Sequence, residues 1–591
     1  MRNVFRMGRP AALCVTVVLA AGIVLSAATP TFWTVSTQLD FLKGDVQDLS
    51  IDSDGRVFLG PSATLVAETS APFLWSVIAG EDGTLFAGSG NEGKVLKVGK
   101  DGKVTTFFDA PELEVHAIAS APKGGIYAAT SPDGKIYAIA ADGTSRTLFD
   151  PEDKYIWALA VDKTGHVFAA TGDKGVIYKI TPDGQGTRFY KTTTTNVVSL
   201  AFARDGSLIA GTESPGRVFR IDPAGKAFVL LDSPYREIHA VRVTDDGTIY
   251  AAAVSGTQGS GEDRSPPPPP TDPTRPPVAS VTTEVTAITV MESPVGASTT
   301  MGSGRGARRP GRGAIYRIRT DGLWDTLWET GDDSPYDLLV EPDGSVLVGT
   351  GTEGKIFRIV GNPARTTLLA RAAARQVTTL LRDSSGRIIG ATSNPGKLFA
   401  LSSSPAKRGS YDSDVRDAGT VASWGAIRWR ANGRAGQMQV FTRSGNTATP
   451  DETWSGWSRA YTQPDGEQIG SPNARYLQWR AVLVADGAAN PGPVLTSVTA
   501  AYLPRNLRPE VSGITVHPPG TVFQRPFSTG ELEIAGFEDN TSDGRQPVQT
   551  TPPAGGASPA APPPPALGRR IYQKGLQTIV WKADDENDDR L

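Results

Sequence analysis

The chain has 591 residues, a formal net charge of −3 and a pI near 6.0. It is too long for one ordinary core, so several domains are expected, and its balanced charge argues against binding nucleic acid or anionic membranes. The 65 glycines and 45 prolines, with only 20% charged residues, favour short strands and tight turns over long helices. The composition therefore predicts an all-β protein.

The N-terminus has the pattern of an export signal. Three arginines within the first nine residues precede an apolar run over 11–25, which ends in the small residues Ser26-Ala27-Ala28. We expect a signal peptide over 1–28, no membrane span after cleavage, and a periplasmic, cell-surface or secreted protein. The alternative is an uncleaved anchor, because the segment nearly reaches the ~20 residues that span a bilayer. The single cysteine, Cys14, lies in this segment, so the mature chain has no thiol for disulfides or metal sites.

An internal repeat dominates the next part of the chain. A turn glycine after a short apolar strand recurs every 41 residues from Gly83 to Gly247, and further copies stand at Gly55, Gly344 and Gly386. In one copy, four strands are expected: Ile156 to Val161, His166 to Thr171, Val176 to Thr181 and Thr187 to Lys191. A four-stranded repeat of about 40–45 residues is typical of a β-propeller blade.

The repeat predicts a seven- or eight-bladed propeller over 38–404, since the first of eight candidate units is short. The last unit stops after its third strand, Lys397 to Leu401, whereas Gln38 to Leu42 resembles the fourth strands of other units. We therefore expect this N-terminal strand to complete the last blade. One blade is interrupted at 255–312 by a Pro-rich and Arg-rich insertion, which is expected to be disordered; the alternative is a lid or a docking segment for an acidic partner.

The register of the repeat exposes a candidate ligand-binding column. The position eight residues before the turn glycine is held by Trp75, His116, Trp157, His239 and Tyr336 in five of the units. If it begins the innermost strand, these side chains ring one mouth of the channel and offer stacking faces and hydrogen bonds to a sugar or peptide. The alternative is that they are packing residues between blades.

Catalysis has less support in the sequence. His116 and His239 stand three blades apart, too far for a shared ligand unless the substrate bridges them, and no repeating column of Asp or Glu accompanies them. Asp337 is the sole acid in the adjacent column. We therefore predict no catalytic residues, no metal site and no cofactor; the Asp-rich segments before Gly55 and Gly247 are expected to be plain turns.

The repeated motifs Asp-Gly-x-Val/Leu-Phe/Tyr-Ala and Gly-Lys-Ile-Tyr-Lys-Ile resemble those of secreted bacterial propellers with NHL, YVTN or WD-type repeats. The resemblance covers about 60% of the chain. It implies the fold and no particular substrate, because such propellers serve as scaffolds, sensors and enzymes.

The period disappears after about residue 410. Alternating strands over 410–503 predict a β-sandwich, and the segments around Trp454, Trp457 and Trp479 resemble galactose-binding-like modules, which implies attachment to a glycan or surface. Trp454 and Trp457 are candidate ligand contacts, with core packing as the alternative. Residues 510–591 are expected to form a partial Ig- or fibronectin-like domain with a Pro-rich insertion at 546–567.

The leading functional hypothesis is an exported, non-enzymatic binding or scaffold protein. It would recognise a glycan or protein partner through the propeller face and the appended sandwich, with association to the cell surface. One alternative is a propeller enzyme, such as a lactonase, lyase or glycan-active type, with a His-based channel site. Another is the extracytoplasmic sensor portion of a surface assembly.

Overall fold

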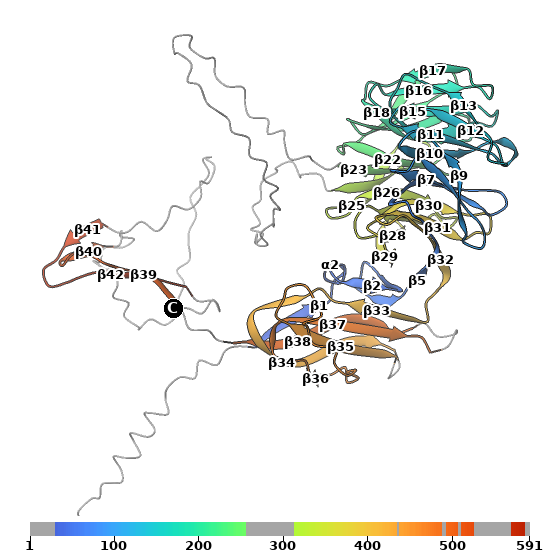
Figure 1. The fold of residues 1–591 in the computed structure, drawn as a ribbon. Helices are drawn as coiled ribbons and strands as arrows, with labels where there is room; N and C mark the ends of the chain where they lie inside the picture. Colours follow the sequence, from blue (N-terminus) through green and yellow to red (C-terminus); the bar gives the residue numbers. More distant parts are fainter. Residues whose placement is uncertain are drawn as a thin grey trace, which may run out of the picture.

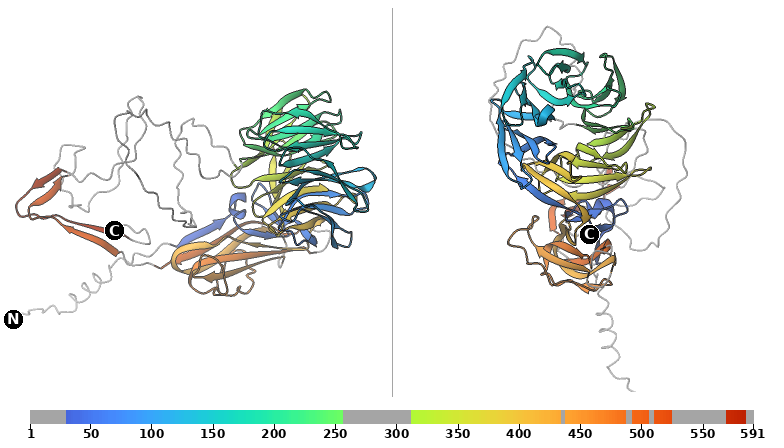
Figure 2. Two further views of the ribbon diagram at one scale, coloured as in Figure 1. Left: turned by 45° about the horizontal axis from the view of Figure 1, so that its top comes forward. Right: turned by 90° about the vertical axis from the view of Figure 1, so that its right-hand side faces the viewer.

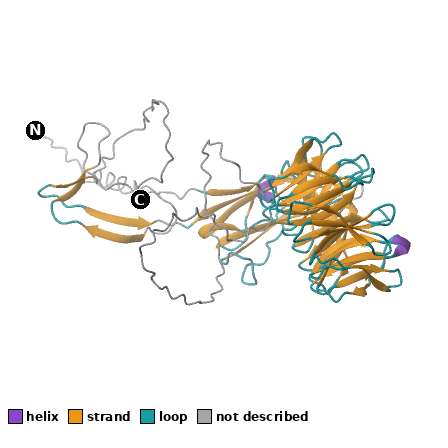
Figure 3. Ribbon diagram, turned by 90° about the horizontal axis from the view of Figure 1, so that it is seen from above, coloured by secondary structure: helices purple, strands orange, loops and turns teal. Residues whose placement is uncertain are grey.

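A computed structural model describes residues 30–255, 312–433, 437–486, 492–505, 510–524 and 569–584. These residues are almost entirely strands and turns (Figure 1, Figure 3), with helical segments only at α2 (Gln38–Phe41) and η1 (Pro122–Gly124) among them. The prediction of an all-β protein is confirmed. The predicted signal peptide, nearly all of the 255–312 insertion and the 546–567 segment lie outside the described residues.

Seven four-stranded antiparallel units follow one another along the chain (Figure 1). The first blade consists of β6 (Phe73–Ala79), β7 (Leu85–Gly90), β8 (Lys94–Val98) and β9 (Val104–Asp109). The second consists of β10 (Glu114–Ser120), β11 (Ile126–Ser131), β12 (Ile136–Ile139) and β13 (Ser145–Phe149). The third consists of β14 (Ile156–Val161), β15 (Val167–Thr171), β16 (Val176–Ile180) and β17 (Gly186–Lys191). The fourth and fifth are β18 (Asn196–Phe202), β19 (Leu208–Glu213), β20 (Arg217–Ile221), β21 (Ala227–Asp232); and β22 (Glu237–Val243), β23 (Ile249–Val254), β24 (Gly313–Ile318), β25 (Trp324–Thr330). The sixth is β26 (Pro335–Val340), β27 (Val346–Thr350), β28 (Lys355–Val360), β29 (Arg365–Arg371), and the seventh begins with β30 (Gln376–Arg382), β31 (Ile388–Ser393) and β32 (Lys397–Pro405).

The blades close into a ring, as the right-hand view of Figure 2 shows. The first strand of each blade contacts the first strand of the next, and β30 of the last blade contacts β6 of the first. The predicted turn glycines have the left-handed conformation that hairpins require, for example Gly83 at φ 79° and Gly165 at φ 85°. The propeller therefore has seven blades, and the candidate unit at Gly55 is not one of them.

The strand that completes the last blade is β5 (Pro61–Glu68), which pairs with β32 in the register Lys397↔Glu68. The prediction that Gln38 to Leu42 plays this part is wrong, because residues 38–41 form helix α2. Thr37 caps that helix by accepting a hydrogen bond from the Asp40 backbone, a local signal that overrides the resemblance to a strand. A strand from before the first blade does close the ring, as expected, but it lies about twenty residues further along the chain.

The other end of the molecule is a β module that draws strands from both sides of the propeller. Its strands are β1 (Thr31–Val35), β2 (Asp45–Gln47), β33 (Arg408–Asp412), β34 (Arg416–Asn432), β35 (Met438–Gly445), β36 (Glu467–Gln468), β37 (Ala474–Val484) and β38 (Val494–Pro504). β1 pairs with β38 and β2 pairs with β33, so residues 31–47 belong here and the expected propeller boundary at residue 38 is corrected. Trp33 of β1 and Trp479 of β37 pack with ring centroids 6.4 Å apart in the core.

A hairpin joins the module to the propeller. Its strands, β3 (Leu49–Ile51) and β4 (Val57–Leu59), connect Leu368 of β29 on one side with Leu495 of β38 on the other. The Ser50 hydroxyl also donates to the Leu369 carbonyl at 2.7 Å. The apolar side chains of the hairpin are buried in one continuous core with both parts, so the joint is a packed interface.

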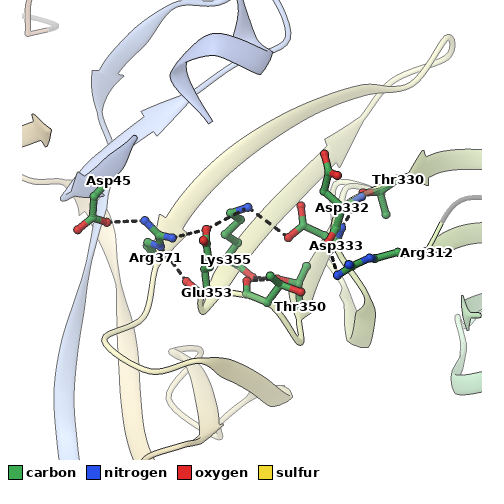
Figure 4. A network of polar contacts seen from close by, with 10 residues as sticks. Asp45, Arg312, Thr330, Asp332, Asp333, Thr350, Glu353, Lys355 and Arg371 are labelled. Carbon is green, nitrogen blue, oxygen red and sulfur yellow. Dashed lines mark hydrogen bonds and ion pairs between the residues drawn. The ribbon is translucent and has the colours of Figure 1, made fainter. Parts of the chain in front are cut away.

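A series of polar contacts runs from Asp45 of the module across the third and fourth strands of the sixth blade to Asp333 (Figure 4). Asp45 of the module pairs with Arg371, which also pairs with Glu353; Lys355 then lies 3.3 Å from Glu353 and 3.4 Å from Asp333. Lys355 and Asp333 are both buried, and burial raises the pKa of Asp333 although Lys355 opposes that change. These contacts link the sixth blade to the module.

The C-terminal part of the described chain forms two strand pairs. β39 (Glu510–Val516) pairs with β42 (Ile579–Asp584), and β40 (Thr521–Gln524) pairs with β41 (Arg569–Tyr572). The Ig-like assignment stays a prediction. Among the described residues, no helix is both long and apolar enough to cross a membrane.

Candidate functional site

The aromatic and histidine column meets at one mouth of the propeller channel. Trp75, His116, His239 and Tyr336 line a cavity of about 690 Å³. They also line an adjoining cavity of about 480 Å³, where Trp157 joins them and where the inner strands continue. Trp75, His116, His239 and Tyr336 thus line both cavities and Trp157 lines the smaller one, and their role as ligand contacts stays a prediction.

Blades one to three supply an aromatic wall. Phe73 stacks on Trp75 with ring centroids 5.4 Å apart, and Tyr155 stacks on Trp157 at 5.3 Å. His116 lies between the two pairs, 5.5 Å from Trp75 and edge-on to Trp157 at 4.7 Å. Trp75 Nε1, His116 Nδ1 and Trp157 Nε1 are buried and have no hydrogen-bond partner among the described residues. Unsatisfied polar atoms of this kind are rare in native proteins and need an explanation.

A second register column explains why the large rings fit. The residue fifteen positions after each column residue lies at the end of the second strand of the same blade or directly after it, and it is Gly90 near Trp75, Gly172 near Trp157 and Gly351 near Tyr336. A Cβ at Gly172 would lie 2.6 Å from Trp157 Nε1, and one at Gly351 would lie 2.4 Å from the Tyr336 ring. Glycine is therefore required wherever the column holds Trp or Tyr.

Replacing Gly172 by Ala tests this packing. The added methyl must displace the Trp157 indole, so we expect the free energy of unfolding to fall by about 1–3 kcal/mol, with a change in the near-ultraviolet circular dichroism of the Tyr155–Trp157 stack. Gly331→Ala is the control, because nothing lies within 4 Å of a Cβ there. Equal urea midpoints for both variants would contradict the explanation.

Blades four and five supply a polar wall. Glu213, at the end of β19, accepts from Asn196 Nδ2 at 2.6 Å and pairs with Arg236 at 3.1 Å. Glu237 begins β22, and Arg312 and Ser255, which flank the insertion, also line the larger cavity. The cavity is thus aromatic on one side and hydrogen-bonding on the other.

Glu237 and His239 form a short pair at the centre of this wall. His239 Nδ1 lies 2.5 Å from Glu237 Oε1, and the histidine ring stacks on Tyr336 at 5.0 Å. Burial lowers the pKa of His239, but the Glu237 carboxylate, helped by Asp337 and Glu213, outweighs it and holds the pKa above its ordinary value. Burial likewise raises the pKa of Glu237, yet His239 and Arg236 hold it below its ordinary value. Both shifts of pKa favour the ionised form of the pair.

His116 behaves in the opposite way. Burial, reinforced by the nearby charge of His239, lowers its pKa to about 4 although Glu237 opposes the change. The pKa values of two histidines facing one cavity are thus shifted in opposite directions. One ligand in this cavity could contact both histidines, which is the bridging arrangement that a shared ligand requires.

The acids of the site come from outside the column that the sequence singled out. Glu237 stands two residues before His239, and Glu213 belongs to the fifteen-residue register, so a search of those two columns would have found both. Asp337 has another part: it is buried and accepts from Arg242 of the fifth blade at 2.5 Å and from the Leu380 backbone of the seventh at 2.8 Å. It ties three blades together.

The tryptophan candidates of the module have close partners of their own. Trp454 is 7% exposed and donates from Nε1 to the Thr447 hydroxyl at 2.8 Å. The guanidinium groups of Arg443 and Arg480 lie 4.5 and 4.3 Å from the centre of the Trp457 ring. A ligand role for either ring stays a prediction. Within the described ranges, no group of three or more His, Cys, Asp or Glu side chains is placed to hold a metal ion.

One protein-family model and several solved structures are similar to this chain. The family model described as "SMP-30/Gluconolactonase/LRE-like region" matches residues 17–210. A comparison with curated proteins found no match. A streptogramin B lyase structure is 12% identical and has a TM-score of 0.43, covering 61% of this chain and 99% of its own; the WD40 β-propeller domain of Doa1 is 12% identical at 0.42, covering 58% and 98%. The extracellular domain of a protein assigned to a hybrid two-component system of B. thetaiotaomicron is 11% identical at 0.43, covering 76% and 60%.

Proposed function

We propose that this chain is an exported binding protein whose propeller holds a saccharide-like ligand in the central cavity. The observation that carries the proposal is the division of the cavity into an aromatic wall around Trp75 and a polar wall around Glu237. A sugar ring has an apolar face that stacks on aromatic side chains and hydroxyl groups that need hydrogen-bonding partners. The cavity of about 690 Å³ also lies within the range usual for small-molecule sites.

The proposal is tested by glycan-array retention followed by calorimetry with the best saccharide. Trp75→Ala is expected to weaken binding by about tenfold, and Trp157→Ala by less, because Trp157 lines only the inner of the two cavities. Trp324→Ala is the control, since this tryptophan is 50% exposed on the outer strand of a blade. Wild-type binding by Trp75→Ala would overturn the proposal, as would binding of peptides alone.

A second candidate function is acid–base catalysis, which the Glu237–His239 pair favours. A carboxylate on one imidazole nitrogen fixes the ring and leaves the other nitrogen to take or give a proton, and positioned groups of this kind contribute about 10²–10⁴-fold to a rate. The test is turnover of lactone and uronate-containing substrates by the wild type and by His239→Asn. Loss of turnover with retained binding would support catalysis; absence of turnover by the wild type would exclude it for those substrates.

A further inference from the structure

The module presents a second groove on the solvent-facing side of strands β34, β38 and β1. Its volume is about 410 Å³. Its floor includes Arg428 and Arg430 of β34, Ser497 and Thr499 of β38, and Phe32 of β1. The groove shares no lining residue with the propeller channel.

The strand register aligns these side chains. Arg428 is paired with Thr499, which is paired in turn with Thr34 across the next strand. Arg430 is paired with Ser497 one row along, and Phe32 with Ala501 in the opposite direction. Because side chains two residues apart project from the same face of a strand, the arginines, hydroxyls and aromatic ring share one surface. The other face carries the buried Trp33, Trp424 and Trp429.

A turn over 462–466 makes one wall of the groove. The Trp429 backbone donates to the Pro464 carbonyl at 3.1 Å, which fixes the turn beside β34. A Cβ at Gly466 would lie 3.1 Å from Arg428 Nε, so the arginine runs directly along this wall. Pro464 and Asp465 of this turn line the groove, as do Ala426, Trp429 and Ala501 of the strands.

The charge of the groove is unbalanced. Three other arginines of the module have carboxylate partners, in Arg475–Asp417, Arg480–Asp412 and Arg459–Glu467. Arg428 and Arg430 are exposed and have no ion pair within the described residues, even though Asp465 lines the same groove. Two guanidinium groups on one face suit a ligand with carboxylate groups, which they bind through paired hydrogen bonds.

We infer that this groove binds an acidic saccharide, a sugar chain that carries carboxylate groups. The guanidinium groups of Arg428 and Arg430 receive the carboxylates, the hydroxyls of Ser497 and Thr499 meet the sugar hydroxyls, and the Phe32 ring, which is 64% exposed, supports a sugar face. The groove is a site separate from the propeller cavity and does not depend on the function proposed there.

The experiment compares galacturonic acid tetramer with galactose tetramer by calorimetry on the full chain. We expect the acidic tetramer alone to bind, more weakly as salt rises. Arg428→Gln and Arg430→Gln should each weaken binding by about tenfold, since a hydrogen bond to a charged group is worth about that change in Kd. Phe32→Ser should weaken it less. Arg408→Gln is the matched control, because Arg408 is an exposed arginine of the same module on β33, away from the groove.

Three results would overturn the inference. They are equal binding of both tetramers, equal weakening by Arg408→Gln, and binding of anionic lipid vesicles through Arg428 and Arg430 without binding of the acidic tetramer. Unfolding midpoints must match the wild type for all variants, so that lost binding is not lost folding. Because Trp75→Ala leaves the groove intact, it should bind the acidic tetramer normally, which separates this site from the propeller cavity.

Discussion

Asp337→Ala is expected to lower the free energy of unfolding by about 1–3 kcal/mol, the usual cost of leaving a buried hydrogen-bond donor without its partner. The Asp337 side chain is 5% exposed and accepts from Arg242 and from the backbone N–H of Leu380. Its loss leaves that N–H buried without its partner and separates the fifth, sixth and seventh blades at the channel. Urea unfolding followed by tryptophan fluorescence measures the change.

The matched control is Asp343→Ala. Asp343 lies in the sixth blade, as Asp337 does, and also pairs with an arginine, Arg358, at 2.5 Å. Its side chain, however, is 55% exposed. Exposed pairs contribute about 0–1 kcal/mol, so this variant should unfold close to the wild type. If both variants lose the same stability, Asp337 does not have the bridging part that its contacts indicate.

Glu237→Gln is expected to reverse the direction in which the pKa of His239 is shifted or to remove the shift. With the carboxylate gone, burial acts on the imidazole with less opposition, so the pKa of His239 falls and the ring is neutral over more of the pH range. The pKa of His116 depends on both members of the pair in opposite directions, because the charge of His239 lowers it and Glu237 opposes that decrease, so its shift should be smaller than that of His239. The chain has four histidines, so selective ¹³C-histidine labelling can resolve their titrations by NMR.

The same substitution should change how stability depends on pH. The folded-state pKa of His239 is raised, so its contribution to stability is fully present below the ordinary value of 6.5 and is lost as the pH rises through the raised value. The pKa of Glu237 is lowered, so its contribution is present above 4.5 and is lost as the pH falls. The free energy of unfolding of the wild type should therefore exceed that of Glu237→Gln most clearly between about pH 4.5 and 6.5.

Glu114→Gln is the control for this titration. Glu114 holds the same register position as Glu237, two residues before the other channel histidine, and burial raises its pKa. It is not among the main groups that shift the pKa of either histidine. A fall in the pKa of His239 on Glu114→Gln as large as that on Glu237→Gln would refute the assignment of the shift to the pair.

The repeat made most of the propeller predictable. A glycine every 41 residues marks a turn that needs positive φ, and a fixed register then tells which residues share a place in every blade. This is why Trp75, His116, Trp157, His239 and Tyr336 could be placed around one channel from sequence alone. The glycines opposite the large rings and the acid at Glu237 obey the same register, although no unusual residue type marks their columns.

The module could not be assembled from the sequence in the same way. Thr34 of β1 and Thr499 of β38 share a hydrogen bond across 465 positions, and no local pattern announces such a partner. At residues 38–41, four residues carry too little periodicity to distinguish a strand from a helix, and the Thr37 and Asp40 caps decide the helix. Sequence periodicity predicts neither strand pairing across hundreds of residues nor a helix of a single capped turn.

Because strands from before and after the propeller build one module, the propeller is inserted within it, and this fixes the order in which the molecule can be completed. As the chain is synthesised, β1 and β2 emerge first but have no partners until β33 to β38 follow more than 360 residues later. The side chains of Trp33, Val35 and Phe41, which are buried in the folded protein, therefore stay exposed to solvent until those strands have been made. A propeller expressed alone should therefore begin at Pro61, since a fragment that begins at Thr31 and ends at Pro405 would carry an apolar segment without its partner strands.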